Sequence, residues 1–252
     1  MAIAQVEQRP RIAGIDLASI IPYEERLSVW KKSNIMFKLD VDSVLVFWRR
    51  FADPLRGTII KAYNKYLLIS YEDPRVIHVS DIVRMLIYGE SNNVSVLDEH
   101  RVRILARGIL YHYLFRKRFG DRVKAVFEFP IVCNVGSVIV VGTIDMLVTA
   151  NDGYYIVELK STNTETTINF GVIQVKAYWS ILENFHNIKV TGAYVSTPRT
   201  DIFVDRPISK RELRRLVALY AKATNRASVI DQLPLHEVSL EESRLGFLHY
   251  FL

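Results

Sequence analysis

The sequence predicts an α/β protein in which a mixed central sheet is flanked by helices. Helical and strand-like segments follow one another between residues 77 and 226 in the order helix, three strands, helix, two strands, helix. The strand-like segments are rich in β-branched and aromatic residues and are separated by short polar turns. Half of the 252 residues are hydrophobic, which is enough for a sizeable core.

The N-terminal 76 residues give weaker signals. Residues 41–51 fit either a short helix or a strand, and residues 57–71 suggest a hairpin. We therefore expect an N-terminal extension, residues 1–76, ahead of a main domain, residues 77–252. The extension could gate a substrate, form the contact of a homo-oligomer or cover a sheet edge. Cover is the favoured role, because exposed edges are routinely protected.

Two helices are expected before the first long strand. Ser80 is a suitable N-cap for a helix that ends near Gly89. Apolar residues recur at helical spacing over 97–120, which predicts a long amphipathic helix. Its last turn is basic and Gly120 follows, as is typical of a helix C-terminus.

The apolar period then changes to that of strands. The expected elements are strands at 124–132, 137–149 and 153–162, a helix at 170–185, strands at 190–197 and 201–209, and a helix at 209–226 capped by Ser209.

Composition excludes several classes of protein. The formal net charge of +6 permits a polyanionic partner without requiring one. Cys133 is the only cysteine, so the chain can form neither an internal disulfide nor a four-cysteine zinc or iron–sulfur site. No apolar run is long enough for a signal peptide or a membrane span. We expect a cytoplasmic protein without membrane contact.

Three charged residues interrupt otherwise apolar strands. Asp145 lies late in one strand, and Glu158 and Lys160 lie at the end of the next. Charged side chains are rarely buried unless they are paired or bind a metal. Residues i and i+2 of a strand share a face, so Glu158 and Lys160 point the same way, and Asp145 can join them if the strands pair. Two carboxylates and a lysine suit metal-assisted phosphodiester hydrolysis, although an ion pair at a sheet edge is the structural alternative.

Four motifs in order extend this pattern: G-x-x-x-H on a helix, G-x-x-D and E-x-K on successive strands, and Q-x-x-x-Y on the next helix. Together they resemble the PD-(D/E)xK nuclease superfamily, in particular its RecB-like branch, which includes CRISPR-associated nucleases. The resemblance covers roughly residues 77–226. The matching residues are Gly108, His112, Gly142, Asp145, Glu158, Lys160, Gln174 and Tyr178.

This resemblance implies a restriction-endonuclease-like core and a metal-dependent DNA nuclease that uses Mg²⁺ or Mn²⁺ and acts on single-stranded DNA or DNA ends. It implies metal ligation by His112, Asp145, Glu158 and the backbone carbonyl of Leu159. Asp145, Glu158 and Lys160 would be catalytic, with Lys160 as the catalytic lysine.

Other roles follow from the same resemblance. Gln174 and Tyr178, one helical turn apart, would position the lysine or a DNA phosphate. Glu128 lies where such nucleases often carry a strand glutamate near the site. Two basic stretches are expected to bind the DNA backbone if they are not merely solvated faces. They comprise Arg116, Lys117, Arg118, Lys210, Arg211, Arg214 and Arg215.

One departure from the family concerns iron. The CRISPR-associated members usually carry four cysteines that hold an iron–sulfur cluster, and the corresponding segments here contain none. We therefore expect no cluster. Two alternatives to the nuclease stay open: a non-catalytic DNA-binding or assembly subunit that retains the fold, and a structure-specific endonuclease for branched DNA.

Overall fold

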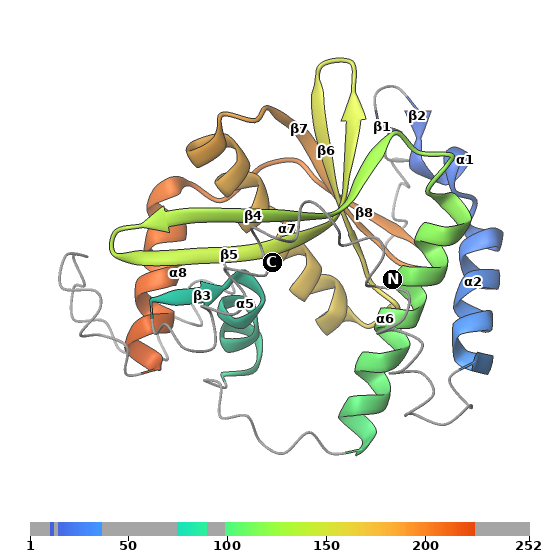
Figure 1. Ribbon diagram of the computed structural model, residues 1–252, viewed down its shortest axis with the longest axis horizontal. Coiled ribbons are helices and arrows are strands. Elements are labelled where there is room, and N and C mark those ends of the chain that lie inside the picture. The colour runs from blue at the N-terminus through green and yellow to red at the C-terminus, as the bar shows by residue number, and fades with distance from the viewer. Residues whose placement is uncertain (1–10, 13–14, 37–74, 90–98, 225–252) are drawn as a thin grey trace, which may run out of the picture.

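A six-stranded mixed sheet forms the centre of the protein (Figure 1). The computed structural model describes residues 11–12, 15–36, 75–89 and 99–224, and side chains within 17–33, 75–89 and 107–224. β4, β5 and β6 are antiparallel neighbours, β6 and β7 are parallel, and β7 and β8 are antiparallel. β3 pairs in parallel with the start of β5. The strands are β3 Val76–His78, β4 Ala125–Val135, β5 Val138–Ala150, β6 Gly153–Leu159, β7 Val190–Ser196 and β8 Asp201–Val204.

Helices cover both faces of this sheet, which confirms the predicted α/β arrangement. α5 (Val79–Tyr88), α7 (Glu165–His186) and α8 (Lys210–Ala223) enclose the larger apolar core on one face. α1 (Leu17–Ile20), α2 (Tyr23–Met36) and α6 (Glu99–Phe119) enclose a second core on the other face. Figure 1 shows α2 beside α6. The short strands β1 (Arg11–Ile12) and β2 (Ile15–Asp16) pair with each other.

Several predicted helix ends are confirmed. Gly89 ends α5 in the left-handed conformation with φ 71°, which glycine adopts without steric cost. Gly120 follows α6, and its N–H donates to the Arg116 carbonyl at 2.8 Å. Ser209 caps α8 through a complete capping box with Glu212.

Other boundaries were predicted wrongly. Ser80 is not the cap of α5, because the helix begins at Val79 and His78 occupies the cap position. α7 begins at Glu165, five residues before the predicted start, because Thr164 accepts a hydrogen bond from the Thr167 N–H and caps it. β8 ends at Val204, short of the predicted residue 209. The predicted hairpin at 57–71 and the segment 41–51 lie outside the described residues.

The N-terminal segment is packed against the rest of the chain where it is described. The expected boundary between residues 76 and 77 falls inside β3. Leu17, Ile21 and Val29 belong to the same apolar core as α6. The described helices α1 and α2 thus cover a sheet face. Among the described helices, none combines the length and apolar character needed to cross a membrane.

β4 and β5 change faces together at one position. In a regular strand, residues i and i+2 point to the same side. Ile144 nevertheless packs into the larger core and Met146 into the second core, so β5 reverses its sides at Asp145. Glu128 lies opposite Asp145 on β4 and has a φ of 53°. Phe127 and Phe129, on either side of it, also pack into different cores, the second and the larger one respectively. This paired kink turns Glu128 and Asp145 out of the regular alternation.

Candidate functional site

Asp145 lies at a fork in the sheet. One edge of β5 pairs with β3 through residues 139–141 and with β6 through residues 146–150, which leaves the intervening stretch without a strand partner on that edge. The Asp145 side chain enters the fork, and its Oδ2 accepts a hydrogen bond from the Leu159 N–H at 2.7 Å. The carboxylate is therefore held at the end of β6, beside Glu158.

His112 reaches the same point from α6. Its Nε2 lies 2.8 Å from the Leu159 carbonyl oxygen, and its Nδ1 lies 3.5 Å from Asp145 Oδ1. Burial lowers the pKa of His112, which favours the neutral imidazole. If Nε2 carries the proton and donates to the carbonyl, the Nδ1 lone pair faces a carboxylate oxygen. Two electron-rich atoms facing each other in this way suit a cation between them.

Glu128 completes a set of three donors. One ligand atom from each of His112, Glu128 and Asp145 lies within 4.8 Å of the other two. The positive φ of Glu128 and the paired kink bring its carboxylate to Asp145. Sequence reasoning placed Glu128 near the site only by resemblance and did not count it among the ligands. A glutamate between two phenylalanines in a strand was the available signal.

Glu158, Lys160, Gln174 and Tyr178 form a chain of hydrogen bonds. Lys160 Nζ donates to Glu158 Oε1 at 2.7 Å and to Gln174 Oε1 at 2.9 Å. Gln174 Nε2 donates to the Tyr178 hydroxyl at 2.9 Å. The structure thus brings Gln174 directly to the lysine, and the buried Tyr178 contacts Gln174.

Glu158 and Asp145 both have pKa values raised above the ordinary range of carboxyl groups. Burial and the neighbouring Asp145 carboxylate raise the pKa of Glu158 to about 7, against the opposing effect of Lys160. Burial and the Glu128 carboxylate also raise the pKa of Asp145. Glu158 Oε2 is buried and has no hydrogen-bond partner among the described residues. A cation at the site would satisfy this oxygen and favour both ionised carboxylates.

We expect the affinity for Mn²⁺ to rise between pH 6 and pH 8. Protons compete with the cation for carboxyl groups whose pKa values are raised, so affinity should fall about tenfold per pH unit below 7 for each proton displaced. Isothermal titration calorimetry in buffers of different ionisation enthalpy would measure both affinity and proton release. Asp152→Asn, in the exposed β5–β6 turn, is the control and should titrate like the wild type. A Mn²⁺ affinity that does not change with pH would contradict binding of the cation by Asp145 and Glu158.

Gly142 of the G-x-x-D motif has a packing role. A Cβ at this position would lie 2.7 Å from Cε1 of the buried Tyr178 ring. Gly142→Ala should therefore destabilise the fold by about 1–3 kcal/mol and displace the tyrosine that supports Gln174. Gly108→Ala is a matched control, because its Cβ would meet Ser161 Oγ at an ordinary 3.7 Å and alanine favours the helix. Thermal melting of the two variants would compare them, and equal losses would contradict this role.

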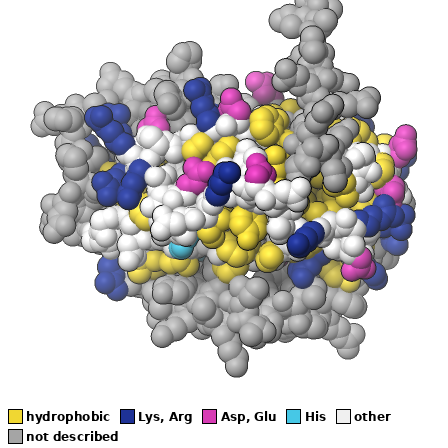
Figure 2. Space-filling view, turned by 90° about the horizontal axis from the view of Figure 1, so that it is seen from above, with side chains coloured by type: hydrophobic (Ala, Val, Ile, Leu, Met, Phe, Trp, Pro, Cys, Tyr) yellow, Lys and Arg dark blue, Asp and Glu magenta, His cyan; other side chains and the backbone are white. Residues whose placement is uncertain are grey.

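The two predicted basic stretches lie on opposite faces of the sheet. Arg118 at the end of α6 is paired with Glu25, and Arg116 lies over the Phe127 ring. α8 packs against α5 and α7 on the other face, with Lys210 over the Phe185 ring. On the face seen in Figure 2, Lys and Arg side chains stand in separate groups among acidic and apolar ones. The two stretches therefore do not form one continuous basic surface. The other residues expected to bind DNA also lie on α6 and α8: Lys117, Arg211, Arg214 and Arg215.

No family model matches the chain, and no curated protein matches it. Among solved structures, the chain is similar to one titled "Crystal structure of SSO0001", with 16% sequence identity and a TM-score of 0.44. That alignment covers 68% of this chain and 87% of the other. What the chain does must therefore be inferred from the geometry of its own residues.

Proposed function

We propose that the protein is a metal-dependent deoxyribonuclease of the RecB-like branch of the PD-(D/E)xK superfamily, with a restriction-endonuclease-like core. It would hydrolyse phosphodiester bonds of single-stranded DNA or DNA ends with Mg²⁺ or Mn²⁺. The observation that carries the proposal is the meeting of Asp145 and Glu158 with a lysine that is hydrogen-bonded on two sides. His112 and Glu128 reach the same point from two further elements.

The donor set fits a hard divalent cation. Carboxylate and carbonyl oxygens suit Mg²⁺ and Mn²⁺, and an imidazole nitrogen is compatible with Mn²⁺. His112, Glu128 and Asp145 would hold the cation together, and the unpartnered Glu158 oxygen is a further ligand beside them. When bound, the cation would supply Lewis-acid polarisation of a phosphoryl oxygen and lower the pKa of a bound water.

Lys160 has one N–H donor available for the reacting groups. An ammonium group has three N–H donors, and Glu158 and Gln174 accept two of them. The third is left for a phosphate oxygen or for the attacking water. The pair of acceptors fixes the direction of that hydrogen, so Lys160 can orient the water and stabilise the negative charge that develops on the phosphate.

Contacts with β7 and α7 hold Lys160 in place. The Lys160 N–H donates to the Ser196 carbonyl at 2.8 Å, which ties it to the end of β7. Its side chain lies over the Phe170 ring, and a Cβ at Gly171 would stand 3.1 Å from Lys160 Cε. The same Cβ would stand 2.7 Å from Val195 Cγ1, so the lack of a side chain at residue 171 lets α7 pack closely on β7 beside the lysine.

The purified protein tests the proposal directly. Incubation with end-labelled linear DNA and with circular single-stranded DNA should give cleavage in Mn²⁺ or Mg²⁺ and none in EDTA. Cleavage of circles would indicate an endonuclease, whereas cleavage restricted to linear DNA would indicate a requirement for ends. A branched substrate distinguishes a structure-specific enzyme. Binding without cleavage under every metal condition would overturn the proposal in favour of a non-catalytic subunit.

A further inference from the structure

Within the part of the chain that the structure describes, Arg107 is a half-buried arginine without a counter-ion. It lies on α6, five residues before His112. Its Nε is buried and has no hydrogen-bond partner, and no ion pair of its guanidinium occurs among the described residues. A partly desolvated cation without an anion is costly, and buried arginines are nearly always paired. An anionic ligand would supply the counter-ion that Arg107 lacks.

Gly108, next to Arg107 on α6, faces the segment that follows Lys160. A Cβ on Gly108 would lie 3.7 Å from Ser161 Oγ, so α6 borders residues 161–163 on one side. On the other side, Thr197 donates to Asn163 Oδ1 at 2.9 Å. The segment that follows Lys160 therefore meets α6 at Ser161 and the β7–β8 turn at Asn163.

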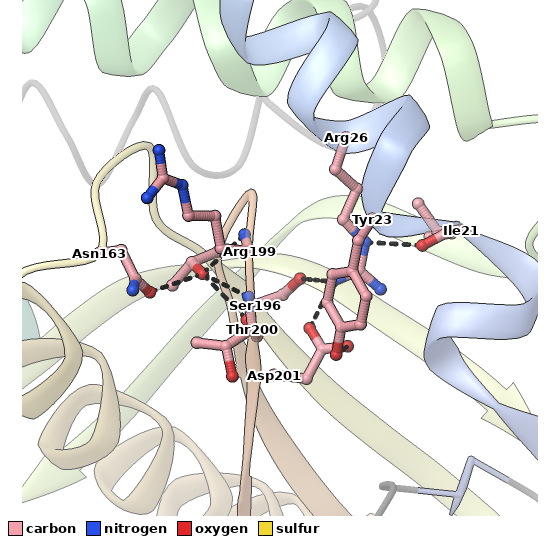
Figure 3. A network of polar contacts seen from close by, with 9 residues as sticks. Ile21, Tyr23, Arg26, Asn163, Ser196, Arg199, Thr200 and Asp201 are labelled. Carbon is pink, nitrogen blue, oxygen red and sulfur yellow. Dashed lines mark hydrogen bonds and ion pairs between the residues drawn. The ribbon is translucent and has the colours of Figure 1, made fainter.

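This turn presents a second arginine. Thr197 Oγ1 accepts hydrogen bonds from the N–H groups of Arg199 and Thr200, at 3.2 and 2.9 Å. The Thr197 hydroxyl also donates to Asn163, and this hydrogen bond fixes the turn to the segment that follows Lys160. Arg199 is exposed, and within the described part of the chain its guanidinium forms no ion pair. Figure 3 shows the guanidinium directed away from the hydrogen-bonded atoms that hold the turn.

The turn of Arg199 lies at the edge where a ligand of this sheet is expected, and α6 reaches this edge at Gly108, next to Arg107 in the sequence. β6 and β7 are parallel, and Leu159 pairs with Ser196 as both strands end. Ligands of such sheets bind beyond the carboxyl ends of parallel strands. Lys160 leaves the end of β6, and the turn that carries Arg199 leaves the end of β7.

We propose that Arg107 and Arg199 form a phosphate clamp that holds one nucleic-acid strand across residues 160–163, beside Lys160. The clamp rests on the proposed nuclease function and deepens it, because it assigns the groups that bind the substrate backbone. Guanidinium groups bind phosphate oxygens through paired N–H donors. Contacts of this kind position a strand without reading its sequence, so we expect binding that is independent of base sequence.

Fluorescence anisotropy of the full-length protein with a labelled oligodeoxythymidylate in EDTA, over a range of NaCl concentrations, measures the clamp apart from cleavage. Arg107→Met and Arg199→Ala should each weaken binding about tenfold, as expected for one charged hydrogen-bonded contact. Each should also reduce the slope of log Kd against log salt concentration by about 0.7, the value for one phosphate of a single strand. Arg199→Lys should keep the slope but not the full affinity.

Arg84→Ala is the matched control, because this α5 arginine is exposed and already paired with Asp81. It should bind like the wild type. Arg107→Met should also raise the melting temperature by about 2–4 °C, since it removes an unpaired, partly buried charge. A merely structural arginine would lower it.

The outcomes separate the clamp from the nuclease. If the wild type cleaves DNA and both variants keep its affinity and salt slope, the clamp is wrong and the nuclease stands. If the wild type binds without cleaving and both variants weaken binding, the clamp stands and the nuclease fails. A wild type that neither binds nor cleaves DNA overturns both.

Discussion

Lys160→Ala is expected to reduce DNA cleavage by about 10³-fold or more, with no loss of the fold. Among the described residues, the lysine is the one cation that forms an ion pair with Glu158, and its remaining N–H is the donor available to the phosphate or the water. Removing a group that stabilises developing charge in a buried site typically costs two to three orders of magnitude or about 3–4 kcal/mol. Single-turnover cleavage of end-labelled DNA in Mn²⁺ would measure the loss.

Two further variants keep this result specific. Lys160→Met fills the same space beside Phe170 and Gly171 without the charge, and it should be as inactive as the alanine variant. Lys124→Ala removes an exposed lysine just before β4 and should leave the rate unchanged. Both Lys160 variants should still bind DNA in EDTA. Wild-type rates in Lys160→Met would exclude this lysine from the chemistry.

The spacing of charged residues in apolar strands predicted a group of side chains that the structure brings close together. Asp145, Glu158 and Lys160 were predicted to share one face if their strands paired, and the described strands do pair. Gln174 was predicted to serve the lysine or a phosphate, and it contacts the lysine. The side-chain hydrogen bonds of Lys160 join residues at most 14 positions apart, which is why the sequence reveals them, whereas Asp145 joins the group from the point where β5 reverses its sides.

The role of Glu128 depends on an irregularity that regular periods do not predict. Alternation assigns faces to strand residues only while the strand stays regular. The paired kink at Glu128 and Asp145 reverses the faces of both strands, and the positive φ of Glu128 is rare for a residue with a side chain. Gly142 and Pro130 lie nearby, but neither stands at the position where the strands reverse. Without the structure, Glu128 could be placed near the site only by resemblance.

Contacts between distant segments were equally hidden. Arg107 and Arg199 stand 92 positions apart in the numbering (199 minus 107), and the sequence analysis singled out neither. The approach of Gly108 to Ser161 and the bond from Thr197 to Asn163 bring the backbone beside each arginine to residues 161–163. The basic runs that the sequence suggested for DNA binding instead lie on two opposite faces of the sheet.

A buried ion pair joins the N-terminal helix α2 to the sheet, and it too had no signal in the sequence. Arg26 is fully buried and donates to Asp201, to Ser196 Oγ at 3.0 Å and to the Ile21 carbonyl at 2.7 Å (Figure 3). Tyr23 adds a hydrogen bond from its hydroxyl to Asp201 at 3.2 Å. The carbonyl of Ser196 is also the acceptor for the Lys160 N–H. This ion pair therefore supports the end of β7, whose Ser196 carbonyl holds the Lys160 backbone.

Arg26→Ala is expected to destabilise the protein by about 3–5 kcal/mol, because it leaves the Asp201 carboxylate buried without its cation. At about 2–4 °C per kcal/mol for a chain of this size, the melting temperature should fall by roughly 10 °C. Arg26→Met combined with Asp201→Leu should recover much of the loss, because a buried ion pair can be replaced by apolar side chains at little cost. Urea unfolding of both variants would measure the free energies.

Glu25→Ala is the control from the same helix. Glu25 forms ion pairs with Arg118 and Arg122, but these lie at the surface, where such pairs contribute little. We therefore expect Glu25→Ala to unfold close to the wild type, while Arg26→Ala unfolds far earlier. Equal effects of the two substitutions would mean that burial of the Arg26 pair does not anchor α2. In that case the position of Ser196 and Lys160 would have to depend on the sheet alone, and cleavage by Arg26→Ala at a temperature where it is folded should match the wild-type rate.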